Sequence, residues 1–150
     1  MRGSGLKGGC FLSAELHRTF EQLRHALDRL REALAQPEDN PLVVDGTIQR
    51  FEFTIELFWK AMKRLLAYEG METNTPRETL QRAYQVGWLK DETAWLEMLR
   101  ARNETSHAYD EVLARRIRDQ IRHHFPEMER TLASLAARLP ARPPGDETSS

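Results

Sequence analysis

Four polar residues, Arg102, Asn103, Ser106 and His107, occupy the part of a helical pattern where buried apolar side chains are expected. The helix that turns Leu99 toward a core should next bury positions 102, 103 and 106. Polar groups at such positions need hydrogen-bond partners or a cleft. A guanidinium holds a phosphate through two parallel hydrogen bonds and stabilises added negative charge, and an imidazole with a pKa near ~6.5 transfers protons at neutral pH. Arg102 and His107 together therefore indicate phosphate chemistry in a cleft.

The same residues also allow a structural interpretation. The step from Arg102 to His107 places the two side chains roughly 140° apart on an ideal helix, so they converge only where the last helical turn unwinds. In the structural interpretation, His107 stabilises the C-terminus of the helix and Arg102 forms an ion pair with Glu104 or Asp110. The spacing leaves both interpretations open.

A charged row lies on another predicted helix. Glu52, Glu56 and Lys60 are spaced at i, i+4 and i+8, so they share one helix face. The order Glu56 before Lys60 is the favourable one for an i,i+4 ion pair. A buried contact between Arg102 and either Glu52 or Glu56 is an equally open use of these carboxylates.

Arginines form a second charged row closer to the C-terminus. Arg115, Arg118 and Arg122 are spaced at i, i+3 and i+7, and with Arg116 they predict a basic strip along one helix. Such a strip can follow an RNA backbone. The alternative is a solvated face whose charge is balanced by nearby carboxylates.

Composition excludes several classes of protein. The 150 residues carry 22 Lys and Arg against 23 Asp and Glu, a formal net charge of −1, which argues against a nucleic-acid coat or a polybasic membrane anchor. The single cysteine, Cys10, excludes an internal disulfide and a four-cysteine zinc site. His123 and His124 are adjacent and diverge by about 100° on a helix, so they do not chelate one metal together. No apolar run reaches the roughly 18 residues of a membrane span. We expect no cofactor and no metal, no membrane contact, and a cytoplasmic protein.

Apolar residues repeat with the period of an α-helix along most of the chain. The stripes predict helices over about 12–34, from 45–47 to about 70, over 75–87, from 91 toward 107, and from 110 to 139. No stretch shows sustained strand alternation. The predicted fold is therefore all-α, an antiparallel up-down four-helix bundle with a short extra helix.

Local signals place several helix ends. Ser13 can cap the first helix and Asp45 or Thr47 the second. Thr75 followed by Pro76 is the clearest start signal, because proline suits the first helical position, and a glutamate three residues after Thr75 can reach back to the Thr75 amide.

Glycine and proline give the remaining signals. Gly70 and Gly87 follow the last turns of the second and third helices, where a left-handed residue is expected. Pro126 interrupts the hydrogen-bond ladder of the last helix, but the apolar stripe keeps its phase across it, so we predict one kinked helix.

The ends of the chain have a different composition from its middle. Residues 1–11 are rich in glycine and predict a flexible N-terminal arm, and residues 140–150 are rich in proline and polar residues and predict a disordered tail. Residues 12–139 then form the helical bundle.

Two blocks of residues resemble those of a known family. The sequence Arg102-x4-His107-x-Tyr109 is similar to the Arg-x4-His-x-Tyr motif of the HEPN superfamily, and specifically of the nucleotidyltransferase substrate-binding protein or HepT-type toxin family. The resemblance covers about residues 13–135. The two blocks are Phe51-Glu52-x3-Glu56-x2-Trp59-Lys60 and Gly87-x7-Trp95-Leu96-x-Met98-Leu99-x2-Arg102-Asn103-x2-Ser106-His107-x-Tyr109-Asp110-Glu111.

This resemblance implies a function and partners. It implies a homodimer in which Arg102 and His107 of both subunits line a cleft, and metal-independent RNA cleavage in which His107 is the general acid or base at the ribose 2′-hydroxyl and Arg102 stabilises the transition state. Asn103 and Ser106 would bind or orient the substrate. Tyr109 would receive AMP from a cognate minimal nucleotidyltransferase, and the added negative charge would repel RNA.

Two other functions stay open. The chain can be a non-catalytic subunit that presents a nucleotide or another substrate to the nucleotidyltransferase, with the Glu52, Glu56 and Lys60 row contributing to binding. It can also be a structural helical dimer. The large apolar stripes of the second and last helices favour a homodimer in each case.

Overall fold

The described part of the chain is entirely helical. The computed structural model describes the backbone of residues 2–105 and 110–142, and the side chains of these ranges from Phe11 on. These residues form five α-helices and no strand: α1 (Arg2–Leu34), α2 (Pro41–Tyr68), α3 (Pro76–Gln85), α4 (Glu92–Glu104) and α5 (Glu111–Ala136). The all-α prediction is confirmed, and α3 is the short extra helix.

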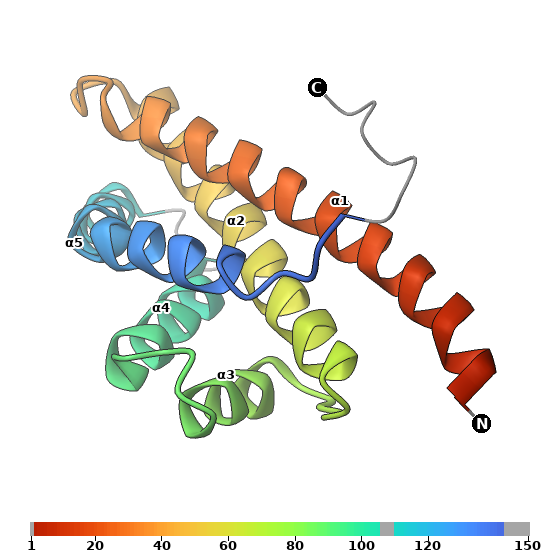
Figure 1. Cartoon of the computed structure of the whole chain (residues 1–150). Helices are drawn as coiled ribbons and strands as arrows, with labels where there is room; N and C mark the ends of the chain where they lie inside the picture. The colour runs from red at the N-terminus through yellow and green to blue at the C-terminus, as the bar shows by residue number, and fades with distance from the viewer. Residues whose placement is uncertain (1, 106–109, 143–150) are drawn as a thin grey trace.

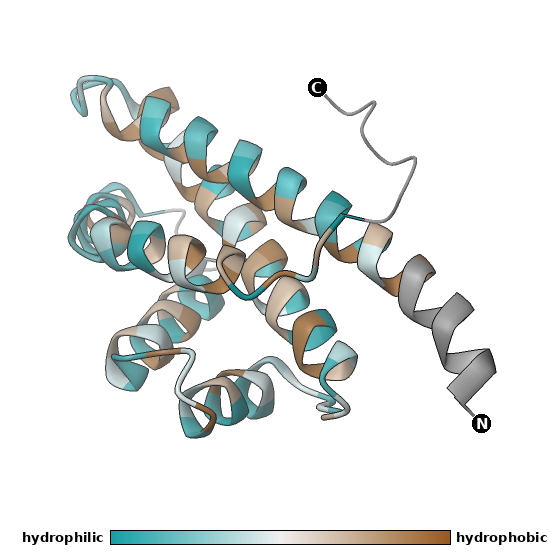
Figure 2. Cartoon of the chain, in the orientation of Figure 1, coloured by the Kyte–Doolittle hydropathy of each residue, from teal (hydrophilic) through white to brown (hydrophobic). Residues whose placement is uncertain are grey.

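The long helices α1 and α2 form an antiparallel pair, and α5 lies across this pair while α3 and α4 close the far side of α2 (Figure 1). Figure 2 shows apolar residues on the faces that α1 and α2 turn toward the other helices. The predicted stripe of α2 is buried along its length, with side chains 0–3% exposed: Phe51, Ile55, Phe58, Met62 and Leu65. Burial of such a stripe is the main force that holds a helix pair together.

The start of α2 differs from the prediction. Asn40 is the N-cap, with its side-chain oxygen accepting from the Leu42 amide at 2.9 Å, and Pro41 is the first helical residue. The prediction of a cap at Asp45 or Thr47 was therefore wrong. Proline suits the first helical position because its missing amide would have no helical partner there, and Pro41 takes this position in α2.

The cap of α3 confirms the prediction in all but one bond. Thr75 Oγ1 accepts from the Glu78 amide at 3.1 Å and Pro76 opens the helix. The Glu78 carboxylate accepts from the Asn74 amide at 2.8 Å, one residue earlier than predicted. The reciprocal bonds still satisfy amides that the first turn leaves without helical partners.

Both predicted glycine ends are confirmed. Gly70 has φ +89° and Gly87 has φ +85°, and in each case the next residue donates its amide back into the helix, from Met71 to Leu66 and from Trp88 to Ala83, both at 2.8 Å. This is the pattern of a Schellman end, which needs a left-handed residue and therefore favours glycine.

The last helix is continuous across Pro126, as predicted, from Glu111 to Ala136, and its kink stays a prediction. Asp110 caps it by accepting from the Val112 amide at 2.8 Å. Buried residues tie α5 to the rest of the bundle: the Trp95 indole of α4 donates to Thr131 Oγ1 at 3.0 Å. This bond joins the start of α4 to the C-terminal half of α5.

The two chain ends contain more structure than composition suggested. Helix α1 begins at Arg2, and Ser13 lies inside it, so Ser13 does not cap the helix. Ser13 Oγ instead donates to the Ala141 carbonyl at 3.2 Å, and the Arg142 guanidinium lies 3.0 Å from a Glu21 carboxylate oxygen. Residues 140–142, assigned to the tail, therefore lie against α1. The limits of arm, bundle and tail stay predictions.

Candidate functional site

Helix α4 presents Arg102 at its last turn. Asp91 caps the helix by accepting from the Ala94 amide at 3.0 Å, and the buried face of α4 then runs through Trp95 and Met98 to Ala101. Arg102 follows Ala101 directly and turns away from this face, so its side chain stays 36% exposed. Packing of the apolar face therefore positions a guanidinium at the rim of the bundle.

Arg102 is paired with α2. Its Nη2 lies 3.6 Å from a Glu56 carboxylate oxygen, and the Glu56 side chain is 35% exposed. The other Glu56 oxygen lies 3.9 Å from the Lys60 ammonium. The predicted ion pair of Glu56 with Lys60 is thus confirmed. Arg102 contacts Glu56 as expected, but the contact is partly exposed and not buried. The expected partners of Arg102 in the structural interpretation, Glu104 and Asp110, form no ion pair with it in the described part of the chain.

This pairing leaves the guanidinium available for a ligand. A guanidinium has five N–H donors, and the contact with Glu56 uses one nitrogen at a distance longer than a good hydrogen bond. Ion pairs that are this exposed contribute little, about 0–1 kcal/mol. A phosphate can therefore approach Arg102 while Glu56 keeps the side chain oriented.

Thr105 was missed by the sequence analysis. It is 8% exposed, and its hydroxyl lies within hydrogen-bonding distance of a Glu52 carboxylate oxygen and 2.7 Å from the Arg102 carbonyl. The hydroxyl proton can go to one of these acceptors at a time. Thr105 links the end of α4 to α2 at Glu52 and so fixes the backbone that carries Arg102. The only signal was its place inside the polar break of the apolar pattern.

The remaining predicted residues are placed as follows. Asn103 lies on the exposed side of α4, next to Arg102. Ser106, His107 and Tyr109 lie outside the described residues, between the end of α4 and the start of α5. Arg102, Glu52, Glu56 and Lys60 are brought together by the structure.

The predicted basic strip on α5 was wrong. Arg118 is 1% exposed, and its guanidinium donates to Thr47, to Glu38 and to two carbonyl oxygens at the end of α1. Arg122 donates to the Leu34 carbonyl at 2.9 Å and Arg115 to the Glu38 carbonyl at 3.0 Å. These side chains bind oxygen atoms at the end of α1 and in the following loop, and with Arg118 buried the row does not form a continuous basic strip.

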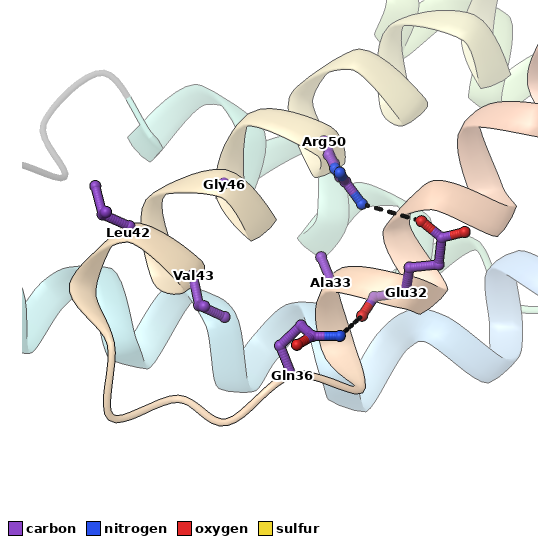
Figure 3. Close-up of a pocket in the computed structure, with 7 residues that line it drawn as sticks. All are labelled: Glu32, Ala33, Gln36, Leu42, Val43, Gly46 and Arg50. Carbon is purple, nitrogen blue, oxygen red and sulfur yellow. Dashed lines mark hydrogen bonds and ion pairs between the residues drawn. The ribbon is translucent and has the colours of Figure 1, made fainter.

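Two hollows in the described part of the surface do not include Arg102. Figure 3 shows a pocket of about 270 Å³ between the end of α1 and the start of α2, where Arg50 pairs with Glu32 at 3.6 Å. Its other lining residues are Ala33, Gln36, Leu42, Val43 and Gly46. A cleft of about 520 Å³ between α4 and α5 carries charges of both signs, including Arg100, Glu97 and His123. Arg102 lines neither of them.

The described residues contain neither a metal-binding cluster nor a membrane span. No group of three or more His, Cys, Asp or Glu side chains there is arranged to hold a metal ion. In the same ranges, no helix combines the length and apolar character needed to cross a membrane.

The chain matches known proteins in family, in sequence and in structure. Residues 18–137 match the protein family described as nucleotidyltransferase substrate binding protein like. A protein of Haemophilus influenzae strain Rd, named probable ribonuclease HepT, is 33% identical over 101 residues, which are 64% of this chain and 69% of that protein. A crystal structure of a Thermus thermophilus protein is similar with a TM-score of 0.67 and 34% identity, covering 79% of this chain and 99% of the other.

Proposed function

The chain belongs to the nucleotidyltransferase substrate binding protein like family, of HepT type, and on that premise we propose that it is a metal-independent endoribonuclease toxin neutralised by a partner nucleotidyltransferase. The proposal places it in the cytoplasm, where RNA and the partner are accessible. The observation that carries it is the Arg102 guanidinium, held at the rim of α4 by Glu56 with a third of its side chain exposed.

The chemistry follows from the residue types. The ribose 2′-oxygen attacks the adjacent phosphorus, and the bond from phosphorus to the 5′-oxygen breaks, giving a cyclic phosphate and a free 5′-hydroxyl. His107 takes the 2′ proton or supplies a proton to the leaving 5′-oxygen. Arg102 stabilises the extra negative charge on the phosphate oxygens in the transition state. Asn103 and Ser106 bind or orient the substrate.

Regulation is proposed to act at Tyr109. A partner nucleotidyltransferase transfers AMP from ATP to the Tyr109 hydroxyl and releases pyrophosphate. The added phosphate carries negative charge and bulk beside Arg102 and His107, so RNA is repelled and the cleft is filled.

The proposed homodimer rests on exposed residues rather than on the apolar stripes. The stripe residues Phe51 and Ile121 are 0% exposed within one chain, so they are not free to form an interface. Phe53 is 62% exposed and Val112 is 68% exposed, and Phe53 adjoins Glu52 in the candidate site. A second copy that covers Phe53 would bring its own Arg102 toward the same cleft.

A second candidate function is a non-catalytic subunit that binds a nucleotide for the nucleotidyltransferase. The description of the family as substrate binding proteins favours it, as does the near-neutral net charge of −1. In this function Arg102, with Lys60 beside Glu56, would hold a nucleotide phosphate without cleavage.

One assay separates the two. Purified protein treated with a chelator should cleave single-stranded RNA, and His107→Ala and Arg102→Ala should abolish the cleavage. His25→Ala is the matched control, because His25 is an exposed histidine of α1, and it should cleave like the wild type. Intact RNA over a wide range of wild-type concentration would overturn the nuclease proposal, and nucleotide binding without cleavage would support the second function.

Regulation and assembly have separate readouts. Incubation with the partner and ATP should add the mass of AMP to the wild type and not to Tyr109→Phe. Light scattering should give the mass of two chains, and Phe53→Asp should reduce it to one. A wild-type mass of one chain would overturn the homodimer.

A further inference from the structure

Trp59 is the one tryptophan among the described residues that lies outside the hydrophobic core. Trp88 and Trp95 are 6% and 1% exposed and belong to the core cluster, and the Trp95 indole donates to Thr131. Trp59 is partly exposed on α2, stands outside that cluster, and forms no hydrogen bond in the described part of the chain. Large aromatic side chains are normally buried, so this indole calls for another explanation.

Two lysines lie near Trp59 on α2. The Lys63 ammonium lies 5.9 Å from the centre of the Trp59 ring, at the outer limit of a cation–π contact. No ion pair with a described carboxylate holds the Lys63 ammonium in place, and its flexible stem allows the ammonium to leave the ring. Lys60 precedes Lys63 by one helical turn and is shared with Glu56 at 3.9 Å.

This aromatic group lies beside the candidate site. Glu56, Trp59 and Lys63 are spaced at i, i+3 and i+7 and so share one face of α2. Glu56 contacts Arg102 at 3.6 Å, and Trp59 follows Glu56 by about 4.5 Å along the helix axis. The indole is therefore within about one helical turn of the residue that meets the guanidinium.

We propose that Trp59 and Lys63 bind a nucleotide of single-stranded RNA next to the one held at Arg102, the base stacking on the indole and the phosphate pairing with the ammonium. The proposal rests on the proposed function for its substrate. Single strands expose the faces of their bases, whereas duplexes cover them, and an aromatic face beside a mobile cation is the usual platform for such strands. The charged neighbours of Trp59 do not form the continuous apolar patch that a protein partner would prefer.

Fluorescence provides a direct test, because the other two tryptophans are buried. The probe is a 2′-O-methyl oligoribonucleotide, which lacks the 2′-hydroxyl needed for cleavage and so reports binding alone. It should quench the emission of the wild type, and the part quenched should be absent in Trp59→Phe. Unquenched wild-type emission at saturating probe, with binding seen by another method, would overturn the proposal.

Variants give the energetic test. Trp59→Ala should bind the probe about tenfold more weakly, since base stacking on an aromatic side chain contributes about that factor or more, and Trp59→Phe should retain most of the affinity. Lys63→Ala should lower the slope of log affinity against log salt by about one. Tyr84→Ala is the matched control, an exposed aromatic residue on α3, and should bind like the wild type.

The outcomes separate this proposal from the nuclease proposal. Quenching without RNA cleavage by the wild type would leave the platform supported and the nuclease proposal overturned. Cleavage with equal affinity in Trp59→Ala and the wild type would leave the nuclease supported and the platform overturned. If Trp59→Ala changed the mass from two chains to one while the affinity of each chain for the probe stayed the same, Trp59 would belong to a protein interface and the RNA proposal would be overturned.

Discussion

Replacing Arg118 by methionine should destabilise the bundle more than any other single change of an arginine on α5. Arg118 is 1% exposed. Its Nε donates to Thr47 Oγ1 at 3.3 Å, its Nη1 to Glu38 at 3.0 Å, and its Nη2 to the Ala33 and Gln36 carbonyls at 3.1 and 3.0 Å. One side chain thus joins α5 to the end of α1, to the following loop and to α2.

The magnitude follows from these bonds and from what they cost. A hydrogen bond from a charged group contributes about 1.5–3 kcal/mol, but burial of the guanidinium, which lowers the pKa of Arg118, offsets a large part of the sum. Breaking a buried charged network costs about 3–5 kcal/mol. Glu38 is 54% exposed and regains water when the arginine is removed, so we expect the lower end, about 3 kcal/mol.

Urea unfolding measures this loss. With a slope of about 2 kcal/mol per molar urea, the midpoint of Arg118→Met should fall by about 1.5 M. The urea midpoint of Arg118→Lys should fall by less, because an ammonium keeps the charge but lacks the planar, forked donors of a guanidinium. Arg116→Met is the matched control, since Arg116 is exposed on the same helix, and should stay within about 0.5 kcal/mol of the wild type. The same small change in Arg118→Met would refute the reasoning.

Three further predictions concern stability. Burial, and then the neighbouring imidazole of His123, lowers the pKa of His124, so as the pH falls below ~6.5 the unfolded chain binds this proton before the folded chain does. The free energy of unfolding should therefore decline from about pH 7 to 5, and it should decline less steeply in His124→Gln. Urea midpoints of the two proteins that fall in parallel over this pH range would contradict the prediction. Gly87→Ala should lower the free energy of unfolding by about 1 kcal/mol because Gly87 has a φ of +85°, whereas Gly46→Ala inside α2 should raise it by about 0.5–1 kcal/mol. Both sites have open space for the added methyl group. The thermal unfolding temperature should therefore shift in opposite directions in the two variants. Thr105→Val should lose about 1–2 kcal/mol with the bond to Glu52, and Thr105→Ser should retain it, as measured by urea unfolding.

Features set by neighbours along the chain could be predicted from the sequence. The left-handed ends at Gly70 and Gly87 and the Thr75 cap of α3 each depend on a few consecutive residues. The apolar stripe of α2 depends only on the helical period. For the same reason Glu56 could be assigned a partner in Lys60, one turn away.

Features set by packing between distant segments could not be predicted. The row Arg115, Arg118 and Arg122 has the same spacing whether it faces water or the end of α1, and the segments that meet Arg118 stand 71–85 residues earlier in the chain.

The sequence by itself therefore determined the five helices, most of their ends and the polar break at the end of α4, because these depend on backbone propensity and local spacing. Tertiary structure alone decided that Arg102 meets Glu56, that Thr105 meets Glu52 and that Arg118 is buried. The physical reason is that the partner of a side chain across a bundle depends on which helix packs against it and on the position of the contact along that helix, and no local pattern encodes either.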